Sequence, residues 1–358
     1  MISRRQVLRG GAALVGAAAL PAAASDLTLA AAARRTGLLY GASVSAEAFA
    51  DRDYLDLYAR ETAIVTTDVA LKFDWLRPTR DRFEFGPADA IVAAARSAGK
   101  LVRGHTLIWN DNAPDWLKRL PGREVERIFD EHIDAVVSRY VGKLHSWDVV
   151  NEPFWPMDRQ EGGWRNGPWF AAMGPSYVER AFRRAAAIDA NAKLTLNEAQ
   201  CENDHSWGRD IRPPLARLVD SLLDKGAPIH AVGFQSHLQP QWPADYPAFA
   251  DWADGFGKKG LEIYLTEFDV NDGGLPGDPA AAKRAVAETG ARFLDAVLKV
   301  PAVAMVVNWQ LSDRYSWYRQ LWARAGRPGA RPPSPLPFDD QLAPNPLREA
   351  MIASFLAR

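Results

Sequence analysis

The stretch His-Ser-Trp-Asp-Val-Val-Asn-Glu-Pro at residues 145–153 combines a short apolar run with a polar end. Its first six residues are predicted to form a buried strand, because β-branched and aromatic side chains favour strands. An amphipathic stretch of helical period lies on each side, at residues 123–140 and 175–188. Strand and helix alternation of this kind is typical of βαβ units in a parallel sheet. The stretch therefore predicts one unit of an α/β fold.

The same alternation extends in both directions from this unit. Strands are predicted at residues 39–44, 63–67, 101–106, 145–150, 193–197, 231–235, 262–266 and 302–308. Helices are predicted at residues 53–59, 87–98, 123–140, 175–188, 214–223, 246–258, 280–298 and 345–356. Eight strands and eight helices predict an α/β fold of the (β/α)8 TIM barrel type, in a single domain. The Pro/Gly-rich stretch 326–337 follows the last strand and is predicted to be a loop, not a domain boundary.

The composition is that of an ordinary globular protein. The chain has 358 residues, of which 47% are hydrophobic, 24% charged and 10% aromatic, so it can bury a large core. Lys and Arg number 43 against 44 Asp and Glu, a balance that argues against binding to nucleic acid or to an anionic membrane. We therefore expect a neutral partner.

The sequence carries no recognisable cofactor motif. Its one cysteine, Cys201, has no partner for an intramolecular disulfide and no Cys/His cluster nearby for a zinc site, so we predict a buried small hydrophobic residue. A dinucleotide-binding glycine turn, a phosphate-binding loop and a His-Glu-x-x-His motif are all missing from the sequence. We therefore expect no cofactor and no metal. A metal-dependent barrel hydrolase remains an alternative, which insensitivity to EDTA would exclude.

Residues 1–24 are predicted to be an export signal. Arg4 and Arg5 precede an apolar run over residues 10–20, and small residues follow. The run is too short to span a bilayer, and paired arginines are typical of the twin-arginine class. We expect the mature domain, residues 25–358, to act in the periplasm or outside the cell, as a monomer without a membrane segment. The alternative is an exposed helical N-terminus of a cytosolic protein.

Polar side chains follow several predicted strands at the barrel end where TIM barrels place their active sites. Two of them, Glu152 and Glu267, follow the fourth and seventh strands, which lie across the barrel mouth from each other. Glycoside hydrolysis needs one carboxylic acid to protonate the leaving oxygen and one carboxylate to attack the anomeric carbon or activate water. Trp109, Trp309 and Trp317 stand nearby, and indole rings pack on the flat faces of sugars. The pattern predicts a carbohydrate site, although a single Glu after a strand is most often a solvated loop residue.

Five motifs stand at these strand ends. They are Gly-His-Thr-Leu-Ile-Trp at 104–109, Trp-Asp-Val-Val-Asn-Glu-Pro at 147–153, Gly-Phe-Gln-Ser-His at 233–237, Leu-Thr-Glu-Phe-Asp at 265–269, and Trp309 with Asp313 and Ser316-Trp317. Together they resemble glycoside hydrolase family ten, the endo-β-1,4-xylanases, over essentially the whole mature chain. The resemblance implies a secreted, retaining, xylanase-like endo-β-1,4-glycanase that acts on a polysaccharide or oligosaccharide.

The resemblance also implies residue roles. Glu152 would be the general acid/base and Glu267 the nucleophile of a double displacement. Asn151 would bond the sugar 2-hydroxyl, while His237, held by Asp269, would orient Glu267 and keep it ionised. The other implied substrate-binding residues, with Trp309 as the floor of the non-reducing side, are Asp68, Lys72, His105, Trp109, Gln235, Trp309 and Trp317.

The chain departs from the family pattern on the side that would recognise the non-reducing sugars. Where the family shows Glu-Asn-x-Met-Lys, residues 68–72 read Asp-Val-Ala-Leu-Lys, so Val69 replaces an amide. Asn110 and Ala199 replace a histidine and a tyrosine. The substrate could therefore be a non-xylan β-1,4-glucan or a bacterial exopolysaccharide. A catalytically weak carbohydrate-binding barrel is a further alternative, against which the intact residues around both glutamates argue.

Overall fold

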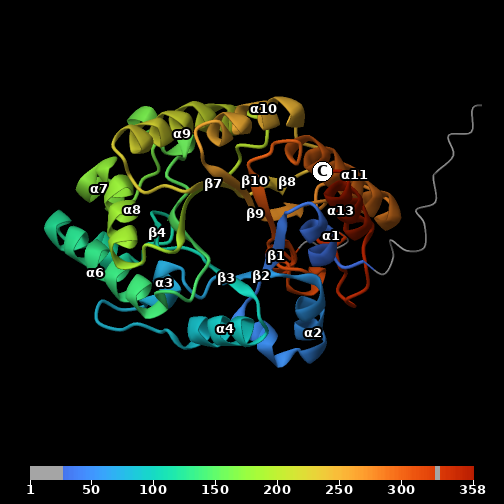
Figure 1. Ribbon diagram of the computed structural model, residues 1–358, viewed down its shortest axis with the longest axis horizontal. Coiled ribbons are helices and arrows are strands. Elements are labelled where there is room, and N and C mark those ends of the chain that lie inside the picture. The colour runs from blue at the N-terminus through green and yellow to red at the C-terminus, as the bar shows by residue number, and fades with distance from the viewer. Residues whose placement is uncertain (1–26, 327–330) are drawn as a thin grey trace, which may run out of the picture.

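The computed structural model describes residues 27–326 and 331–358, and its strands close into a ring inside a layer of helices (Figure 1). The barrel strands are β1 (Leu39–Ser43), β2 (Ile64–Thr66), β3 (Leu101–Gly104), β5 (Ser146–Asn151), β6 (Lys193–Glu198), β7 (Ala231–Phe234), β9 (Glu262–Val270) and β10 (Val303–Asn308). Neighbouring strands are parallel, and β10 pairs with both β9 and β1 to close the ring. The predicted TIM barrel is confirmed.

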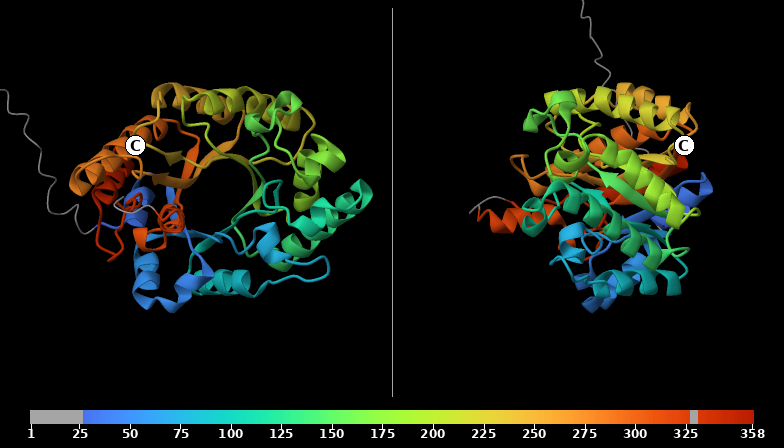
Figure 2. Two further views of the ribbon diagram at one scale, coloured as in Figure 1. Left: turned by 180° about the vertical axis from the view of Figure 1, so that it is seen from behind. Right: turned by 90° about the vertical axis from the view of Figure 1, so that its left-hand side faces the viewer.

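Helices cover the outside of the ring, as two further views also show (Figure 2). The main ones are α2 (Arg52–Glu61), α4 (Gly86–Ser97), α6 (Gly122–Tyr140), α8 (Ser176–Ile188), α9 (Ser206–Asp224), α10 (Tyr246–Gly257), α11 (Pro279–Val297) and α13 (Pro346–Leu356). In α6 the buried residues include Val125, Ile128, Phe129, Ile133 and Val136, which recur every three or four positions. This spacing places one apolar stripe against the barrel. Within the described residues, no helix is long and apolar enough to cross a membrane.

Several elements were not predicted or were predicted with wrong ends. Helix α9 begins at Ser206, not at residue 214, and Pro213 and Pro214 lie inside it. The prediction took Pro214 as the helix start, but the ring nitrogen Nδ1 of His205 accepts a hydrogen bond from the Gly208 amide at 3.2 Å and caps the helix earlier. The unpredicted elements are α1 (Leu29–Arg35), α3 (Phe73–Leu76), α5 (Asp115–Lys118), α7 (Pro168–Met173), α12 (Trp317–Arg324), β4 (Ile108–Trp109) and β8 (His237–Leu238). Residues 1–26 of the predicted signal segment and residues 327–330 of the predicted loop lie outside the described residues.

The first described residues are fastened to the last helix. The carboxylate of Glu61 accepts a hydrogen bond from the Leu29 amide at 2.8 Å and another from Arg348 at 3.1 Å. Arg348 also donates to the Leu27 carbonyl at 2.8 Å. The Glu61 and Arg348 side chains are almost fully buried, so the charge of each is compensated by the charge of the other. The first described residues and the last helix therefore meet beside the strand pair that closes the barrel.

The barrel interior changes from apolar to charged along its axis. Ile64, Ala231, Tyr264, Met305 and Val307 form a buried apolar cluster. The Arg103 guanidinium lies 5.3 Å from the centre of the Tyr264 ring and pairs with Asp148, and both charged side chains are buried. Asp148 also lies 2.9 Å from His105 Nδ1. The ion pair thus fixes a histidine at the carboxyl ends of the strands.

Candidate active site

The two predicted catalytic glutamates lie at the carboxyl ends of the strands and are largely buried. Glu152 directly follows β5 and is 9% exposed, and Glu267 lies near the end of β9 and is 5% exposed. Glu152 has a positive φ of 46°, as do Asp68 (47°), Ser236 (63°) and Gln310 (71°) after three other strands. Left-handed backbone is costly for residues other than glycine and tends to gather at functional sites. The strand ends are therefore shaped to aim particular side chains.

A chain of amide side chains connects the two carboxylates. Asn197 Nδ2 donates to Glu267 Oε1 at 2.9 Å and to Asn151 Oδ1 at 2.8 Å. Gln235 Nε2 donates to Glu152 Oε1 at 2.7 Å and lies 3.5 Å from Asn151 Oδ1. A Cβ atom at Gly233 would come within 2.3 Å of Asn197 Oδ1, so this strand position must be glycine. The amides hold both carboxylates in fixed orientations. Asn197 was not among the predicted site residues.

His237 lies between two carboxylates. Its Nδ1 is 2.9 Å from Asp269 Oδ1, and its Nε2 is 3.3 Å from Glu267 Oε2. Burial disfavours the charged imidazole, but Asp269 and Glu267 outweigh burial and raise the pKa of His237 to about 10. Burial would likewise raise the pKa of Glu267, but the His237 hydrogen bond and the nearby His105 and Lys72 lower it to about 2. Glu267 is therefore an ionised carboxylate at neutral pH.

Trp317 also contacts this group. Its indole Nε1 donates to Asp269 Oδ2 at 3.1 Å, so the side chain predicted to bind substrate also supports the partner of His237. The Trp317 and His237 rings lie 5.2 Å apart.

Glu152 has a different environment. Arg165 Nη2 donates to Glu152 Oε2 at 2.5 Å, and Arg165 Nε donates to the Glu152 carbonyl at 3.0 Å. Sequence reasoning missed Arg165, because it stands thirteen positions after Glu152 in a loop of no regular period and reaches the site only when that loop folds back. Apart from its charge, no sequence signal marks it. The two glutamates thus have different charged neighbours. Glu152 contacts Arg165, and Glu267 contacts His237.

The predicted residues of the non-reducing side gather on one flank of the carboxylates. The Lys72 ammonium lies 5.0 Å from the Trp109 ring centre and 5.4 Å from that of Trp309, which is 6% exposed. The His105 ring is 5.0 Å from the Trp309 ring and nearly perpendicular to it. Asp68 is buried and accepts a hydrogen bond from Gln310 at 2.8 Å. A cation, an imidazole and two indoles suit the hydroxyls and flat faces of a neutral sugar.

The three departures from the family pattern differ in their surroundings. Asn110 is buried, and its Oδ1 accepts the amides of Trp169 at 3.2 Å and Phe170 at 3.4 Å, so it caps the start of α7. Ala199 is buried as well, whereas Val69 keeps part of its surface exposed. The structure therefore explains why an asparagine stands at position 110. Of the three departures, only Val69 has a side chain that is partly exposed to solvent.

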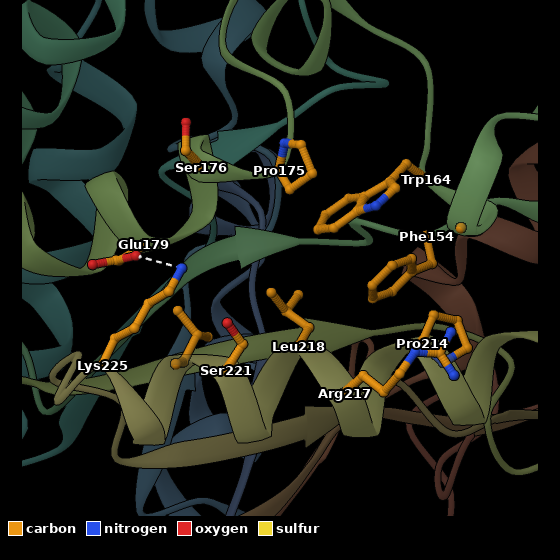
Figure 3. Close-up of a pocket in the computed structure, with 12 residues that line it drawn as sticks. Phe154, Trp164, Pro175, Ser176, Glu179, Pro214, Arg217, Leu218, Ser221 and Lys225 are labelled. Carbon is orange, nitrogen blue, oxygen red and sulfur yellow. Dashed lines mark ion pairs between the residues drawn. The ribbon is translucent and has the colours of Figure 1, made fainter.

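A groove of about 450 Å³ between α8 and α9 is separate from these residues (Figure 3). Its lining includes Phe154, Trp164 and Leu218, with the Lys225 and Glu179 ion pair at one end. None of the predicted site residues lines it. The described part of the chain also contains no group of three or more His, Cys, Asp or Glu side chains arranged to hold a metal ion.

Known proteins similar to this chain agree with the geometry. The model of glycosyl hydrolase family 10 matches residues 28–354, and that of the twin-arginine translocation signal sequence matches residues 1–21. Endo-1,4-beta-xylanase B of Thermotoga neapolitana is 31% identical over 306 residues, covering 83% of each chain. A thermostable celloxylanase of Thermoclostridium stercorarium is 33% identical over 324 residues, covering 83% of this chain and 80% of that protein. The crystal structure of xylanase 10B from Thermotoga petrophila in complex with xylobiose has a TM-score of 0.81 at 29% identity, covering 92% of this chain and 97% of that one.

Proposed function

Because the chain belongs to glycosyl hydrolase family 10, we propose that Glu152 and Glu267 carry out its hydrolysis of β-1,4-linked glycans as acid/base and nucleophile. The enzyme is a xylanase-like glycoside hydrolase with a twin-arginine signal for export to the periplasm or the exterior. The observation that carries the assignment is the pair of buried carboxylates with different partners. Glu267, facing the His237 cation, suits the role that must stay ionised.

The first chemical step cleaves the glycosidic bond. A Glu267 carboxylate oxygen attacks the anomeric carbon, and the bond from that carbon to the leaving oxygen breaks. The Glu152 carboxylic acid gives its proton to the leaving oxygen, so the leaving sugar departs as a neutral alcohol. Asn151, whose Oδ1 is fixed by Asn197 at 2.8 Å, would bond the sugar 2-hydroxyl, a contact that strengthens as positive charge develops on the ring.

The second step releases the glycone. The Glu152 carboxylate removes a proton from water, the oxygen of that water attacks the anomeric carbon, and the ester bond to Glu267 breaks. Glu267 returns as a carboxylate and Glu152 as an acid, so the cycle closes. Two displacements leave the product with the β configuration of the substrate.

The substrate class we propose is a β-1,4-linked xylan or glucan, cut within the chain. Several similar proteins bear the name endo-1,4-beta-xylanase, and one bears the name thermostable celloxylanase. Val69 favours a glucan over a xylan. Its apolar side chain cannot make the hydrogen bonds of the amide that the family has at this position, and it leaves room for the hydroxymethyl group that each glucose unit carries.

We also infer a signal comprising residues 1–24 and a mature, monomeric domain of residues 25–358. N-terminal sequencing of the exported protein tests the signal, and analytical ultracentrifugation tests the monomer.

Azide rescue separates the two catalytic roles. In Glu267→Ala, azide can attack the anomeric carbon directly, and turnover of an activated aryl glycoside should return with an α-glycosyl azide as product. In Glu152→Ala the glycosyl-enzyme still forms from that substrate, and azide should release the β-glycosyl azide. Exchanged anomers would mean that the roles are reversed. No rescue in either variant, with both proteins folded, would reject the pair.

A further inference from the structure

The loop that follows β5 folds back so that one of its side chains, Arg165, contacts Glu152, the proposed acid/base residue. We propose that Arg165 is a positioning residue that holds Glu152 in place and stabilises its carboxylate form during catalysis. This inference rests on the proposed role of Glu152. The contact that motivates it joins Arg165 Nη2 to Glu152 Oε2 at 2.5 Å, with the Arg165 side chain only 7% exposed.

The loop between these residues is a closed hairpin. Phe154 and Trp164 form an isolated antiparallel bridge, the Trp155 amide donates to the Gly163 carbonyl at 2.8 Å, and the Arg165 amide donates to the Pro153 carbonyl at 2.8 Å. The Phe154 and Trp164 rings lie 4.6 Å apart, and Figure 3 shows both at one end of the groove between α8 and α9. Backbone hydrogen bonds and the packing of these two rings therefore fix the position of the Arg165 backbone.

The guanidinium is held on three sides. It bonds the carboxylate of Glu152, donates from Nε to the Glu152 carbonyl at 3.0 Å, and lies 4.6 Å from the centre of the Trp155 ring. Two nitrogens of the Arg165 guanidinium donate to Glu152, and the Trp155 ring packs against the guanidinium plane. The group therefore has little freedom to rotate. Its orientation, and with it that of the Glu152 carboxylate, is set before substrate arrives.

The charges around Glu152 make this arginine significant. Glu198, on the adjacent strand β6, is fully buried, and burial followed by the charge of Glu152 raises the pKa of Glu198. Asp111 lies 3.8 Å from Arg165 Nη1, and Glu267 is connected to Glu152 only through neutral amides. Among the described residues, Arg165 is the cation in contact with Glu152. It offsets the repulsion that nearby carboxylates would impose on the ionised form.

Both steps of the reaction depend on this balance. Glu152 Oε1 accepts from Gln235 and Oε2 accepts from Arg165, so a proton on either oxygen must displace or weaken one of these contacts. The cation thus favours the carboxylate, which is formed when the proton leaves in the first step and which acts as the base in the second. Removing the cation should disfavour the carboxylate form of Glu152 relative to the acid form, and this change is read from the alkaline limb of the activity profile.

The experiment compares Arg165→Met and Arg165→Lys with the wild type in pH profiles of kcat/KM on xylohexaose and cellohexaose. For Arg165→Met we expect the alkaline limb of the profile to move to higher pH, by about one unit, and the plateau of kcat/KM to fall about tenfold. On an activated aryl glycoside, whose first step needs little acid, the loss should be smaller. Arg165→Lys keeps the positive charge but loses the pair of donors that Arg165 directs at Glu152. Its alkaline limb should therefore stay near that of the wild type, while the plateau of its kcat/KM falls.

A matched control is Arg77→Met. Arg77 is also buried, lies 4.7 Å from a Phe83 ring and pairs with Glu131 at 3.3 Å, but none of its contacts is with a site residue. It should leave the limb positions unchanged. Because a limb position does not depend on the fraction of folded enzyme, partial misfolding cannot imitate the expected result.

Two outcomes are distinguishable. An unmoved alkaline limb in Arg165→Met, together with loss of that limb in Glu152→Ala, would overturn the role of Arg165 while leaving the proposed function intact. An alkaline limb that persists in Glu152→Ala would instead overturn the acid/base assignment itself.

Discussion

Replacing His237 by Gln tests whether the His237 cation keeps Glu267, the proposed nucleophile, ionised. The Asp269 carboxylate lies 2.9 Å from His237 Nδ1, and its charge opposes the loss of the imidazole proton that burial favours, so the imidazole is charged throughout the acid range. The amide of Gln still offers a hydrogen-bond donor but carries no charge. Glu267 therefore loses a cationic neighbour at every pH.

The magnitude follows from the pKa of Glu267. Its ordinary value of 4.5 falls to about 2, a difference of about 2.5 units. At roughly 1.4 kcal/mol per unit this is about 3 kcal/mol in favour of the carboxylate. The His237 hydrogen bond is the largest of the lowering contributions, while His105 and Lys72 remain in the variant. Without the His237 contribution, the pKa of Glu267 should rise by on the order of one unit.

The assay is the pH dependence of kcat/KM on an aryl β-glycoside. Because Glu267 must be ionised to attack, a raised pKa moves the acid limb to higher pH, and on that limb activity should fall about tenfold. Asp189→Asn serves as the control, since Asp189 is a buried carboxylate that accepts backbone amides of Gly142 and Asn191 far from the strand ends that hold the site. An acid limb of His237→Gln that coincides with the wild type would refute the reasoning, and the charge of His237 would then play no part in keeping Glu267 ionised.

Three further substitutions test other parts of the site. Glu152→Ala should flatten the alkaline limb on an activated aryl glycoside, because the group whose deprotonation ends activity is gone; an unchanged limb would indicate another proton donor. Val69→Asn should raise kcat/KM on xylo-oligosaccharides about fivefold, on the order of 1 kcal/mol for one regained hydrogen bond, and should lower it on cello-oligosaccharides. Strong wild-type activity on xylan, unchanged or reduced by Val69→Asn, would mean that neighbouring side chains already compensate. Asn110→Ala removes the cap of α7 and should lower the free energy of unfolding by about 1 kcal/mol in urea titrations, and an unchanged unfolding midpoint would contradict the capping role.

The barrel could be predicted from sequence because its signals are local. Each strand is a short β-branched run, and a run such as 145–150 needs no distant information to be recognised. Helix α9 was predicted too short because proline normally marks a helix start, and the cap from His205 could not be distinguished from a loop histidine. Glu152, Glu267 and His237 could be singled out as candidates because they belong to motifs.

Other features depend on contacts that sequence does not encode locally. Arg165 and Asn197 act through the folding back of a loop and the pairing of two strands, respectively. The structural reason for Asn110 likewise appears only when α7 is placed above it. Residues proposed to touch the reacting atoms were therefore easier to identify from the sequence than the residues that hold them in place.

The junction between the first described residues and the last helix has a consequence for export. Twin-arginine substrates usually cross the membrane already folded. Pairing of β10 with β1 closes the ring, and Arg348 of α13 reaches back to Leu27 and Glu61. A chain folded without α13 would leave Glu61 buried without its cation, a costly state. The segment that follows the signal is thus anchored only when α13 is docked, so a fold that is ready for the translocase has to include this helix.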